Sequence, residues 1–349
     1  MNKQKAFVFS VVLWLIFMGL FVSVRFIGTG FNHFFLDSNQ KVIIFWVLSS
    51  LIFATVFWLS LIMENNPKIR RQAYYKLILL KAGLMVIAVF LFTTAVLISG
   101  IIRGNPVDVA ISEYTAWVFS PVMLVNLLYI SASTIMISFI WQMGIKIGPN
   151  VLMNLLLGKY YNPREEDRVF MFLDMKSSTT IAEKIGNKRY SKLIQDCFAD
   201  LTDSAINHKV EIYQYVGDEA ILTWKTATGI KDNNCIYTFY DFQKSLEKRK
   251  AYYIKQYGIF PTFKAGLNSG LVVVTEVGII KREIAYLSDV LNTAARIQGK
   301  CNELNSQLLI SEEVKNALIP DNNLIFEDEG IFELRGKQIG VRLFKVFLT

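Results

Sequence analysis

Residues 169–180 read VFMFLDMKSSTT, and this stretch decides the fold of the second half of the chain. Val169 to Leu173 form an apolar run with the length and composition of a buried strand, and the run ends on Asp174. A lysine and four hydroxyl side chains follow it closely. A carboxylate at the end of a core strand, before a Ser/Thr-rich turn, is either a helix cap or a metal ligand beside a phosphate. This stretch alone leaves both interpretations open.

The apolar residues are concentrated in the first 143 residues. The sequence has 349 residues, of which 53% are hydrophobic, too many for one soluble domain. A helix needs about 20 apolar residues to cross about 30 Å of hydrocarbon. A cleaved signal peptide is the alternative for the first apolar segment, but that segment is long and lacks a small-residue cleavage pattern. We predict a four-helix transmembrane region over residues 1–143, with these spans: Phe7–Ile27, Val42–Met63, Leu77–Ile102 and Ala116–Met143.

Basic residues in the short loops predict the orientation. They precede the first span, fill the loop after the second and follow the fourth: Lys3, Lys5, Lys68, Arg70, Arg71, Lys76, Lys146 and Lys159. Both termini are therefore expected in the cytoplasm, in a multi-pass protein of the cell (inner) membrane. The formal net charge of +8 is partly this asymmetry, and no basic run is dense enough to predict a nucleic-acid partner.

Three further cations lie near or within the spans. Arg25, Lys81 and Arg103 are expected to extend their side chains to the membrane interface. The three cysteines fall in the cytoplasmic part without metal-ligand spacing and are expected to be reduced thiols: Cys197, Cys235 and Cys301.

The remaining sequence divides into a cytoplasmic linker, residues 144–164, and one mixed domain, residues 165–349. After the strand that ends at Asp174, the patterns predict these elements: a helix at 179–208, strands at 210–215 and 220–224, a helix within 230–257, strands at 263–268 and 271–277, a helix at 288–304 and a closing pair of strands. The order strand, helix, strand, strand, helix, strand, with additions, predicts an α+β ferredoxin-like sandwich. Its helices are expected on one face of a largely antiparallel sheet.

A second informative stretch is YQYVGDEAILTW, residues 213–224. Gly217, Asp218 and Glu219 join two strand-like runs in a tight hairpin, a composition that by itself is typical of a solvated turn. In a ferredoxin-like order the first strand lies beside this hairpin, so Asp174 and Asp218 are expected to meet at one edge of the sheet. Two carboxylates without a nearby lysine repel each other unless they share a divalent cation.

The third stretch is SDVLNTAARIQGKCNEL, residues 288–304. Asn292 and Arg296 stand four residues apart and share one face of the predicted helix, while Ala294, Ala295 and Ile297 suit its packed side. In isolation such a pair is an exposed polar face. A glycine-punctuated strand pair before this helix and the LRGKQ turn at 334–338 after it favour a functional interpretation.

Together the three stretches resemble the class III nucleotidyl cyclases, the adenylate and guanylate cyclases. The family's first metal motif, a strand ending in Phe-x-Asp-Ile-x-Gly-Phe-Thr, is matched in outline by Phe172, Asp174, Met175 and Thr179. Ser177 and Ser178 stand where the family usually has glycine and phenylalanine. The resemblance spans Arg168 to Phe347, and the family's Gly-Asp hairpin and Asn-x-Ala-x-Arg helix fall on these residues: Gly217, Asp218, Asn292, Ala294 and Arg296.

The resemblance implies a reaction in which the ribose 3′ oxygen attacks the α-phosphorus of its own nucleoside triphosphate and expels pyrophosphate. It implies two divalent metal ions, Mg²⁺ or Mn²⁺, at a site made by Asp174, Met175 and Asp218, with Asn292 orienting the ribose and Arg296 stabilising charge on the phosphoryl oxygens. Phosphate contacts are implied for the turn after Asp174 and for a lysine near the C-terminus: Lys176, Ser177, Ser178, Thr179 and Lys337. On this resemblance, Asp174 is a metal ligand rather than a cap.

The base-contacting positions depart from the family. Adenylate cyclases usually carry lysine and aspartate where this chain has Gln214 and Ala285, and guanylate cyclases usually carry glutamate and a small residue. The resemblance also implies a base contact for Asp289, which precedes Asn292 at the interval expected for the family. A glutamine amide can donate to adenine N1 or accept from guanine N1. We expect ATP, with GTP as the alternative.

The family also forms head-to-tail dimers in which one chain supplies the aspartates and the other supplies the Asn/Arg helix. This chain carries both halves, so the resemblance implies a homodimer with two shared active sites and an inactive monomer. Two rival hypotheses are a catalytically silent nucleotide-binding receptor module and a diguanylate cyclase. The second has a related fold, but Val216 replaces the first glycine of its Gly-Gly-Asp-Glu-Phe hairpin.

Overall fold

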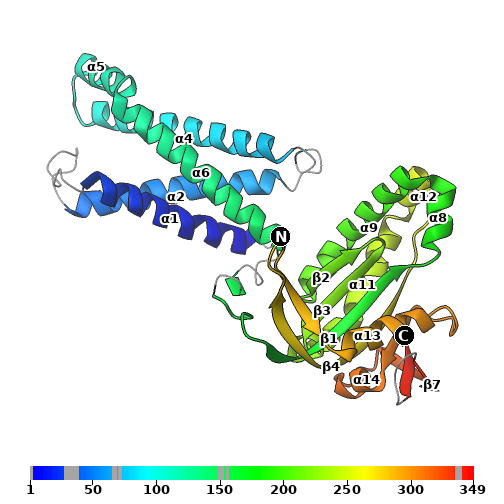
Figure 1. Cartoon of the computed structure of the whole chain (residues 1–349). Coiled ribbons are helices and arrows are strands. Elements are labelled where there is room, and N and C mark those ends of the chain that lie inside the picture. Colours follow the sequence, from blue (N-terminus) through cyan, green and yellow to red (C-terminus); the bar gives the residue numbers. More distant parts are fainter. Residues whose placement is uncertain are drawn as a thin grey trace. The chain divides into compact units, whose positions relative to one another are not determined.

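The computed structural model of the chain comprises two compact units, Met1–Ile147 and Gly148–Thr349 (Figure 1). It describes residues 3–26, 39–64, 69, 73–147, 153–154, 157–334 and 340–349. Within the expected linker, residues 144–164, the stretches 148–152 and 155–156 therefore lie outside the described residues.

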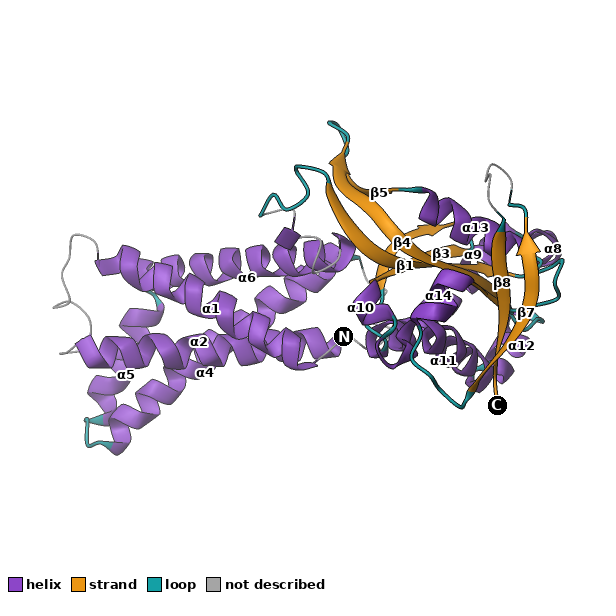
Figure 2. Ribbon diagram, turned by 90° about the horizontal axis from the view of Figure 1, so that it is seen from below, coloured by secondary structure: helices purple, strands orange, loops and turns teal. Residues whose placement is uncertain are grey.

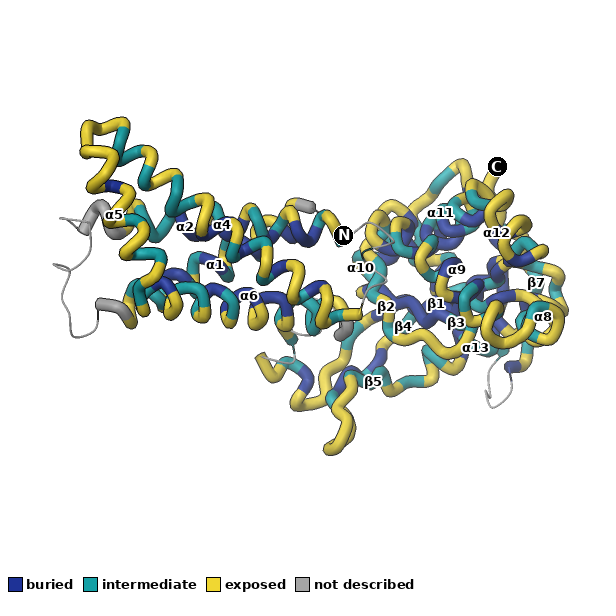
Figure 3. Tube along the Cα trace, turned by 90° about the horizontal axis from the view of Figure 1, so that it is seen from above, coloured by how far each residue is buried: buried dark blue, intermediate teal, exposed yellow. Residues whose placement is uncertain are grey.

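The first unit is helical: α1 (Lys3–Phe26), α2 (Asn39–Met63), α4 (Tyr74–Ile102), α5 (Val107–Val118) and α6 (Pro121–Ile147). Four of these helices have the length and hydropathy of membrane spans: Ala6–Val24, Ile43–Met63, Tyr74–Ile102 and Pro121–Ile145. Their outer sides are exposed and apolar (Figure 3). On α1 the exposed residues recur every fourth position, as on one helix face: Val8, Val12, Ile16, Leu20 and Val24.

The fourth span begins later than the sequence predicted. A start at Ala116 was expected, but α5 ends at Val118 and α6 starts at Pro121. Proline lacks a backbone N–H and disfavours helical geometry in the residue before it, so the chain breaks there and proline takes the first position of the new helix.

Lys81 does not reach outward as the sequence analysis expected. Its side chain is 1% exposed, and its Nζ lies 2.7 Å from Oε1 of Glu64 and 5.2 Å from the centre of the Phe57 ring. A lysine inside an apolar bundle needs such a partner, because unpaired charge in that setting is costly. Arg103 is exposed and donates to Ser99 Oγ at 2.9 Å, and the Arg25 side chain lies outside the described part.

The second unit contains the following elements: β1 (Arg164–Met175), α8 (Ser178–Ile185), α9 (Asn187–Asn207), β2 (Glu211–Val216), β3 (Glu219–Lys225), α10 (Thr226–Gly229), the short 3₁₀ helix η2 (Lys231–Asn233), α11 (Asn234–Lys248), α12 (Lys250–Tyr257), β4 (Phe263–Val277), β5 (Glu283–Leu287), α13 (Asp289–Lys300), β6 (Leu308–Ser311), α14 (Glu312–Ala317), β7 (Leu324–Phe332) and β8 (Val341–Leu348).

These strands form one sheet in the order β2-β3-β1-β4-β6-β8-β7, and β5 pairs with β4. The first four strands have the ferredoxin-like arrangement that the sequence predicted. Two details differ. The strands expected at 263–268 and 271–277 are one continuous strand, β4, because Ser269 and Gly270 keep their pairing with β1. Three closing strands are present where two were expected. Strand β5 was not predicted.

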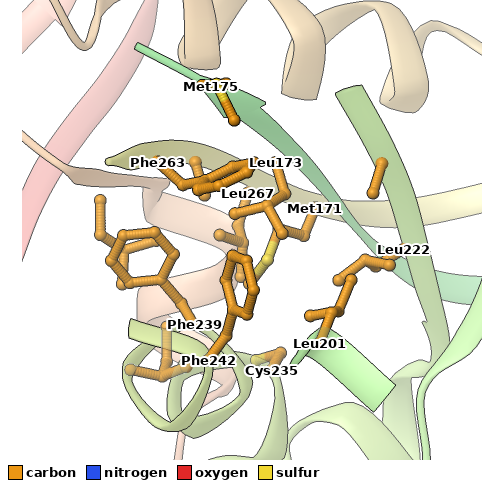
Figure 4. Close-up of a cluster of buried hydrophobic side chains, with 14 of the residues drawn as sticks. Met171, Leu173, Met175, Leu201, Leu222, Cys235, Phe239, Phe242, Phe263 and Leu267 are labelled. Carbon is orange, nitrogen blue, oxygen red and sulfur yellow. The ribbon is translucent and has the colours of Figure 1, made fainter. Parts of the chain in front are cut away.

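Side chains of β1 are buried on both faces of the sheet, so this strand lies at the centre of the domain. Met171, Leu173 and Met175 pack on one face against α9 and α11, with Phe239 and Phe242 opposite them (Figure 4). The alternate residues, Phe170 and Phe172, pack on the other face with Ala294 of α13. The helices therefore cover both faces (Figure 2), which corrects the expectation that they lie on one.

Candidate active site

A row of charged residues crosses the sheet at the end of β1. Asp174 pairs in register with Glu219 of β3 on one side and with Lys264 of β4 on the other. Paired residues on neighbouring strands point to the same face, so all three side chains lie on the face covered by α13. The topology thus gathers two carboxylates and an ammonium group at one place.

Asp174 is held from two directions. Its Oδ2 accepts a 2.8 Å hydrogen bond from Nε2 of Gln298 on α13 and lies 3.6 Å from Nζ of Lys264. Burial and then the charge of Asp218 raise its pKa, and Lys264 opposes that shift. From the sequence, the two carboxylates were expected to lack a nearby lysine, and the position of Lys264 corrects that expectation.

Asp218 lies at the tip of the hairpin between β2 and β3. Gly217 before it has φ +63°, a left-handed conformation that glycine adopts without strain. The tip approaches α9, where burial and then Asp218 raise the pKa of Tyr190 to about 12. The buried Oδ2 of Asp218 has no hydrogen-bond partner among the described residues. The expected meeting of Asp174 and Asp218 is present, and an acceptor atom there is unsatisfied.

Glu219 adds a third carboxylate next to this pair. Burial, then Asp174, then Asp218 raise its pKa to about 7, because each neighbouring negative charge disfavours another. Such crowding of negative charge is what a bound cation relieves. No group of three or more His, Cys, Asp or Glu side chains in the described part of the chain is arranged to hold a metal alone. Two carboxylates are nevertheless sufficient for Mg²⁺, which keeps waters and substrate phosphates as its other ligands.

The turn after Asp174 leads directly into a helix. The Met175 side chain is buried in the hydrophobic core, so only its backbone is available to the site. Lys176 donates its backbone N–H to the Thr262 carbonyl at 2.9 Å, Ser177 has φ 58°, and α8 begins at Ser178. The first backbone N–H groups of a helix lack partners within it, so those of Ser178 and Thr179 are open to an anion.

Asn292 and Arg296 point away from Asp174 of their own chain. At about 100° per residue, Arg296 lies roughly 160° around the helix from Gln298, and Asn292 roughly 120°. Since Gln298 faces Asp174, the Asn/Arg face is directed elsewhere. Nη1 of Arg296 makes no hydrogen bond within the described residues and lies 3.8 Å from Oδ1 of Asp289.

The expected base-contacting residues lie on three elements. Gln214 is exposed on β2, Ala285 pairs with Thr275 in the β4–β5 ladder, and Asp289 begins α13. Lys337 lies outside the described residues. Two neighbours of Asp174 were missed by the sequence analysis, Lys264 and Gln298. Gln298 could have been found, because it lies four residues after Ala294 on the packed side of the helix.

Comparisons with known proteins place these features in a family. Residues 160–347 match the family described as "Adenylate and Guanylate cyclase catalytic domain". "Adenylate cyclase 2" of Rhizobium meliloti (strain 1021) is 34% identical over 223 residues, which cover 64% of this chain and 61% of that protein. The chain thus matches less than two thirds of that relative's length.

Solved structures include domains of the same architecture. A bacterial light-regulated adenylyl cyclase superposes with a TM-score of 0.52 at 18% identity, covering 61% of this chain and 63% of that one. The guanylate cyclase domain of RhGC from Catenaria anguillulae, solved in complex with GTP, has a TM-score of 0.44 at 16% identity, covering 53% of this chain and 98% of that one. The first similarity supports the fold assigned to the second unit.

Proposed function

This chain belongs to the adenylate and guanylate cyclase family, and from that premise we propose that it converts ATP to 3′,5′-cyclic AMP and pyrophosphate. The observation that carries the proposal is the meeting of Asp174 with Asp218 at the edge of the sheet, beside Lys264 and an open helix N-terminus. These groups together suit a metal-bound triphosphate. The name of the Rhizobium relative supports ATP as the substrate.

Asp174 and Asp218 are the residues that would hold two divalent metal ions, Mg²⁺ or Mn²⁺, together with the backbone of Met175. The unsatisfied Oδ2 of Asp218 and the raised pKa of Asp174 fit this role, because oxygen ligands with excess negative charge suit a hard cation. When bound, the ions lower the pKa of the ribose 3′ hydroxyl and neutralise charge on the triphosphate.

Other residues of the chain would position the substrate. The backbone amides of the turn from Lys176 to Thr179 would bind phosphate oxygens at the N-terminus of α8. Lys264 supplies positive charge on the same face, and Lys337 is proposed for the terminal phosphates. Arg296 would stabilise the negative charge that develops on the α-phosphoryl oxygens, while Asn292 would orient the ribose.

The two halves of the site are proposed to come from different chains. Asn292 and Arg296 cannot face the Asp174 of their own chain while Gln298 of the same helix contacts it. A two-fold homodimer in which α13 of each chain faces the partner's aspartates provides two complete sites. A monomer then lacks catalytic activity.

Base selection is proposed to depend on Gln214 and Ala285. Ala285 offers no side-chain polar group, so Gln214 is the side chain that would read the base edge. A guanylate cyclase that uses GTP is the alternative, since the glutamine amide matches either base. The four apolar helices support anchoring in a membrane. The basic loops are the basis for proposing the cell (inner) membrane with both termini in the cytoplasm.

The decisive experiment assays the full-length protein, purified in detergent with Mn²⁺ and supplied with ATP or GTP. Cyclic AMP is the expected product from ATP, with much less cyclic GMP from GTP. Asp174→Ala is the matched inactive control, because it removes a proposed metal ligand at a partly exposed position. A preference for GTP would replace adenylate with guanylate cyclase. No cyclic nucleotide from either substrate would favour a silent nucleotide-binding module, and cyclic di-GMP would indicate a diguanylate cyclase.

A further inference from the structure

Among the described residues of the second unit, the most deeply buried cation lies outside the proposed metal site. The Arg168 side chain, on β1, is 2% exposed. Its Nε and Nη2 contact Oε2 of Glu166 at 2.9 and 2.8 Å, and its Nη1 donates to Oε2 of Glu211 on β2 at 2.7 Å. The guanidinium also lies over the Tyr286 ring of β5, 4.8 Å from its centre. One side chain thus connects three strands through two ion pairs and one cation–π contact.

Two residues that Arg168 contacts, Glu211 and Tyr286, lie near the proposed base-contacting positions. Glu211 precedes Gln214 by three residues on the short strand β2, and Tyr286 is adjacent to Ala285 on β5. The ring of Tyr213 meets that of Tyr286 edge to face at 4.9 Å. Although β2 and β5 do not pair in the sheet, Arg168 and this aromatic contact fix them relative to each other.

Through Glu166, the contacts of Arg168 extend to the segment that leads into the domain. The Tyr160 hydroxyl donates to Oε1 of Glu166 at 2.9 Å, and Lys159 Nζ lies 3.1 Å from the same oxygen. The backbone N–H of Glu276, on β4, donates to the Tyr160 carbonyl at 2.9 Å. Tyr160 is itself 4% exposed, so this part of the segment belongs to the fold of the domain.

We propose that Arg168 is a positioning residue that sets the spacing between Gln214 and Ala285 and couples that spacing to Tyr160. The inference rests on the proposed function, since it concerns the site that receives the nucleotide base. A displacement of the segment at Tyr160 acts on Glu166, then on Arg168, and through Arg168 on both β2 and β5. The network thereby gives the chain preceding the domain a route to substrate affinity rather than to the reacting atoms.

The test uses the full-length protein in detergent with three changes at once, Arg168→Met, Glu166→Gln and Glu211→Gln. The combined change removes the charges without leaving a buried carboxylate unpaired, so the domain is expected to fold. We expect KM for ATP to rise by roughly tenfold with kcat nearly unchanged, because a misplaced base-binding group weakens ground state and transition state alike. Tyr160→Phe, which removes only the hydroxyl, should move KM in the same direction by about twofold.

The matched control is Arg249→Met. Arg249 also pairs with a carboxylate, Asp200, and lies over the Tyr252 and Tyr253 rings, but it contacts neither β2 nor β5. KM should stay at the wild-type value in this variant. If the triple variant lowers kcat or the yield of folded protein and leaves KM unchanged, Arg168 is only structural and the proposal fails. An unchanged KM in Tyr160→Phe, beside a raised one in the triple variant, would refute the coupling to the entering segment.

Hydrogen exchange without substrate provides a readout that does not depend on activity. The triple variant should exchange faster in residues 211–216 and 283–287, while other strands keep their wild-type rates. Unchanged exchange there, or an equal rise across the whole domain, would overturn the positioning role. If the wild type makes no cyclic nucleotide, the proposed function fails, and the exchange data still decide whether Arg168 orders these strands.

Discussion

Gln298 of α13 donates a hydrogen bond of 2.8 Å to Asp174 of β1, and these two residues are 124 positions apart in the sequence. Gln298 is 7% exposed, so its amide lies in the packed interface between the helix and the sheet. The bond fixes the orientation of a carboxylate that is proposed to bind metal. It also fixes which face of α13 is left for other contacts.

Replacing the Gln298 side chain should lower the affinity for metal more than it lowers the stability of the fold. For Gln298→Leu we expect the Mn²⁺ concentration that gives half-maximal activity to rise by roughly 10- to 100-fold, because groups that orient a ligand contribute that much to metal affinity. Titration of activity with Mn²⁺ measures it, and Gln195→Leu, at an exposed position on α9, is the control. Equal metal dependence in both variants would remove Gln298 from the site.

Two inactive variants should restore each other if the site is shared. Asp174→Ala and Arg296→Ala chains, co-expressed, form heterodimers in which one site carries both changes and the other carries neither. Random pairing makes about half of the dimers heterodimers, so roughly a quarter of wild-type activity should return. The cyclic AMP made by the mixture measures this. A mixture with heterodimers present and no activity would show that each site is built within one chain.

Lys264 should contribute to catalysis through its charge. In Lys264→Met we expect kcat/KM for ATP to fall by roughly 100-fold, because one preorganised positive group beside developing charge contributes about that factor. Lys264→Arg should keep most of the activity. Lys225→Met, at the exposed end of β3, is the control for a general loss of positive charge. Wild-type kinetics in Lys264→Met would contradict the role.

The close approach of α13 to β4 depends on Gly266. A Cβ at this position would lie 2.7 Å from the Ala294 carbonyl oxygen and closer still to the backbone of Gln298. Gly266→Ala should therefore destabilise the domain by about 1–3 kcal/mol and lower its melting temperature by several degrees. At Gly299, which has open space around it, alanine should instead stabilise α13 by up to about 1 kcal/mol. Thermal unfolding of both variants in detergent tests the contrast.

The ionisation of Glu166 should make the stability of the folded domain depend on pH. Burial would raise its pKa, but Arg168, Tyr160 and Lys159 together lower it from 4.5 to about 2. A lowered pKa means that the carboxylate stabilises the fold above pH 4.5, and that this contribution, about 3 kcal/mol, is lost as the pH falls towards 2. Glu166→Gln should be less stable than wild type at pH 7, with a difference that shrinks below pH 4.5. A difference independent of pH would contradict the assignment.

Most of the fold could be predicted because its determinants are local. Apolar length predicted the spans, and the run from Val169 to Asp174 predicted the central strand. The features that were missed depend on tertiary contacts. Whether Lys81 reaches outward or pairs with Glu64 depends on how two helices pack, and whether β4 continues through Gly270 depends on its pairing with β1.

In the candidate site too, some residues could be predicted from the sequence and others depend on tertiary contacts. Asp174, Asp218, Asn292 and Arg296 were predicted as site residues because three short motifs occur together, although each motif alone has more than one interpretation. Lys264 is a single lysine in a strand, and only the register of β4 against β1 brings it to Asp174. Periodicity predicted that Asn292 and Arg296 share a face, but the direction of that face became known only from the contact between Gln298 and Asp174.

The ion pair between Glu64 and Lys81 has a consequence for how the protein is made. A lysine within a single apolar helix adds about 3 kcal/mol to the free energy of inserting that helix into a bilayer. Its partner carboxylate lies directly after α2, which is the candidate span that precedes α4 in the sequence. During biogenesis α2 should therefore stay at the translocon until α4 has been synthesised, and the two helices should enter the lipid together as a hairpin.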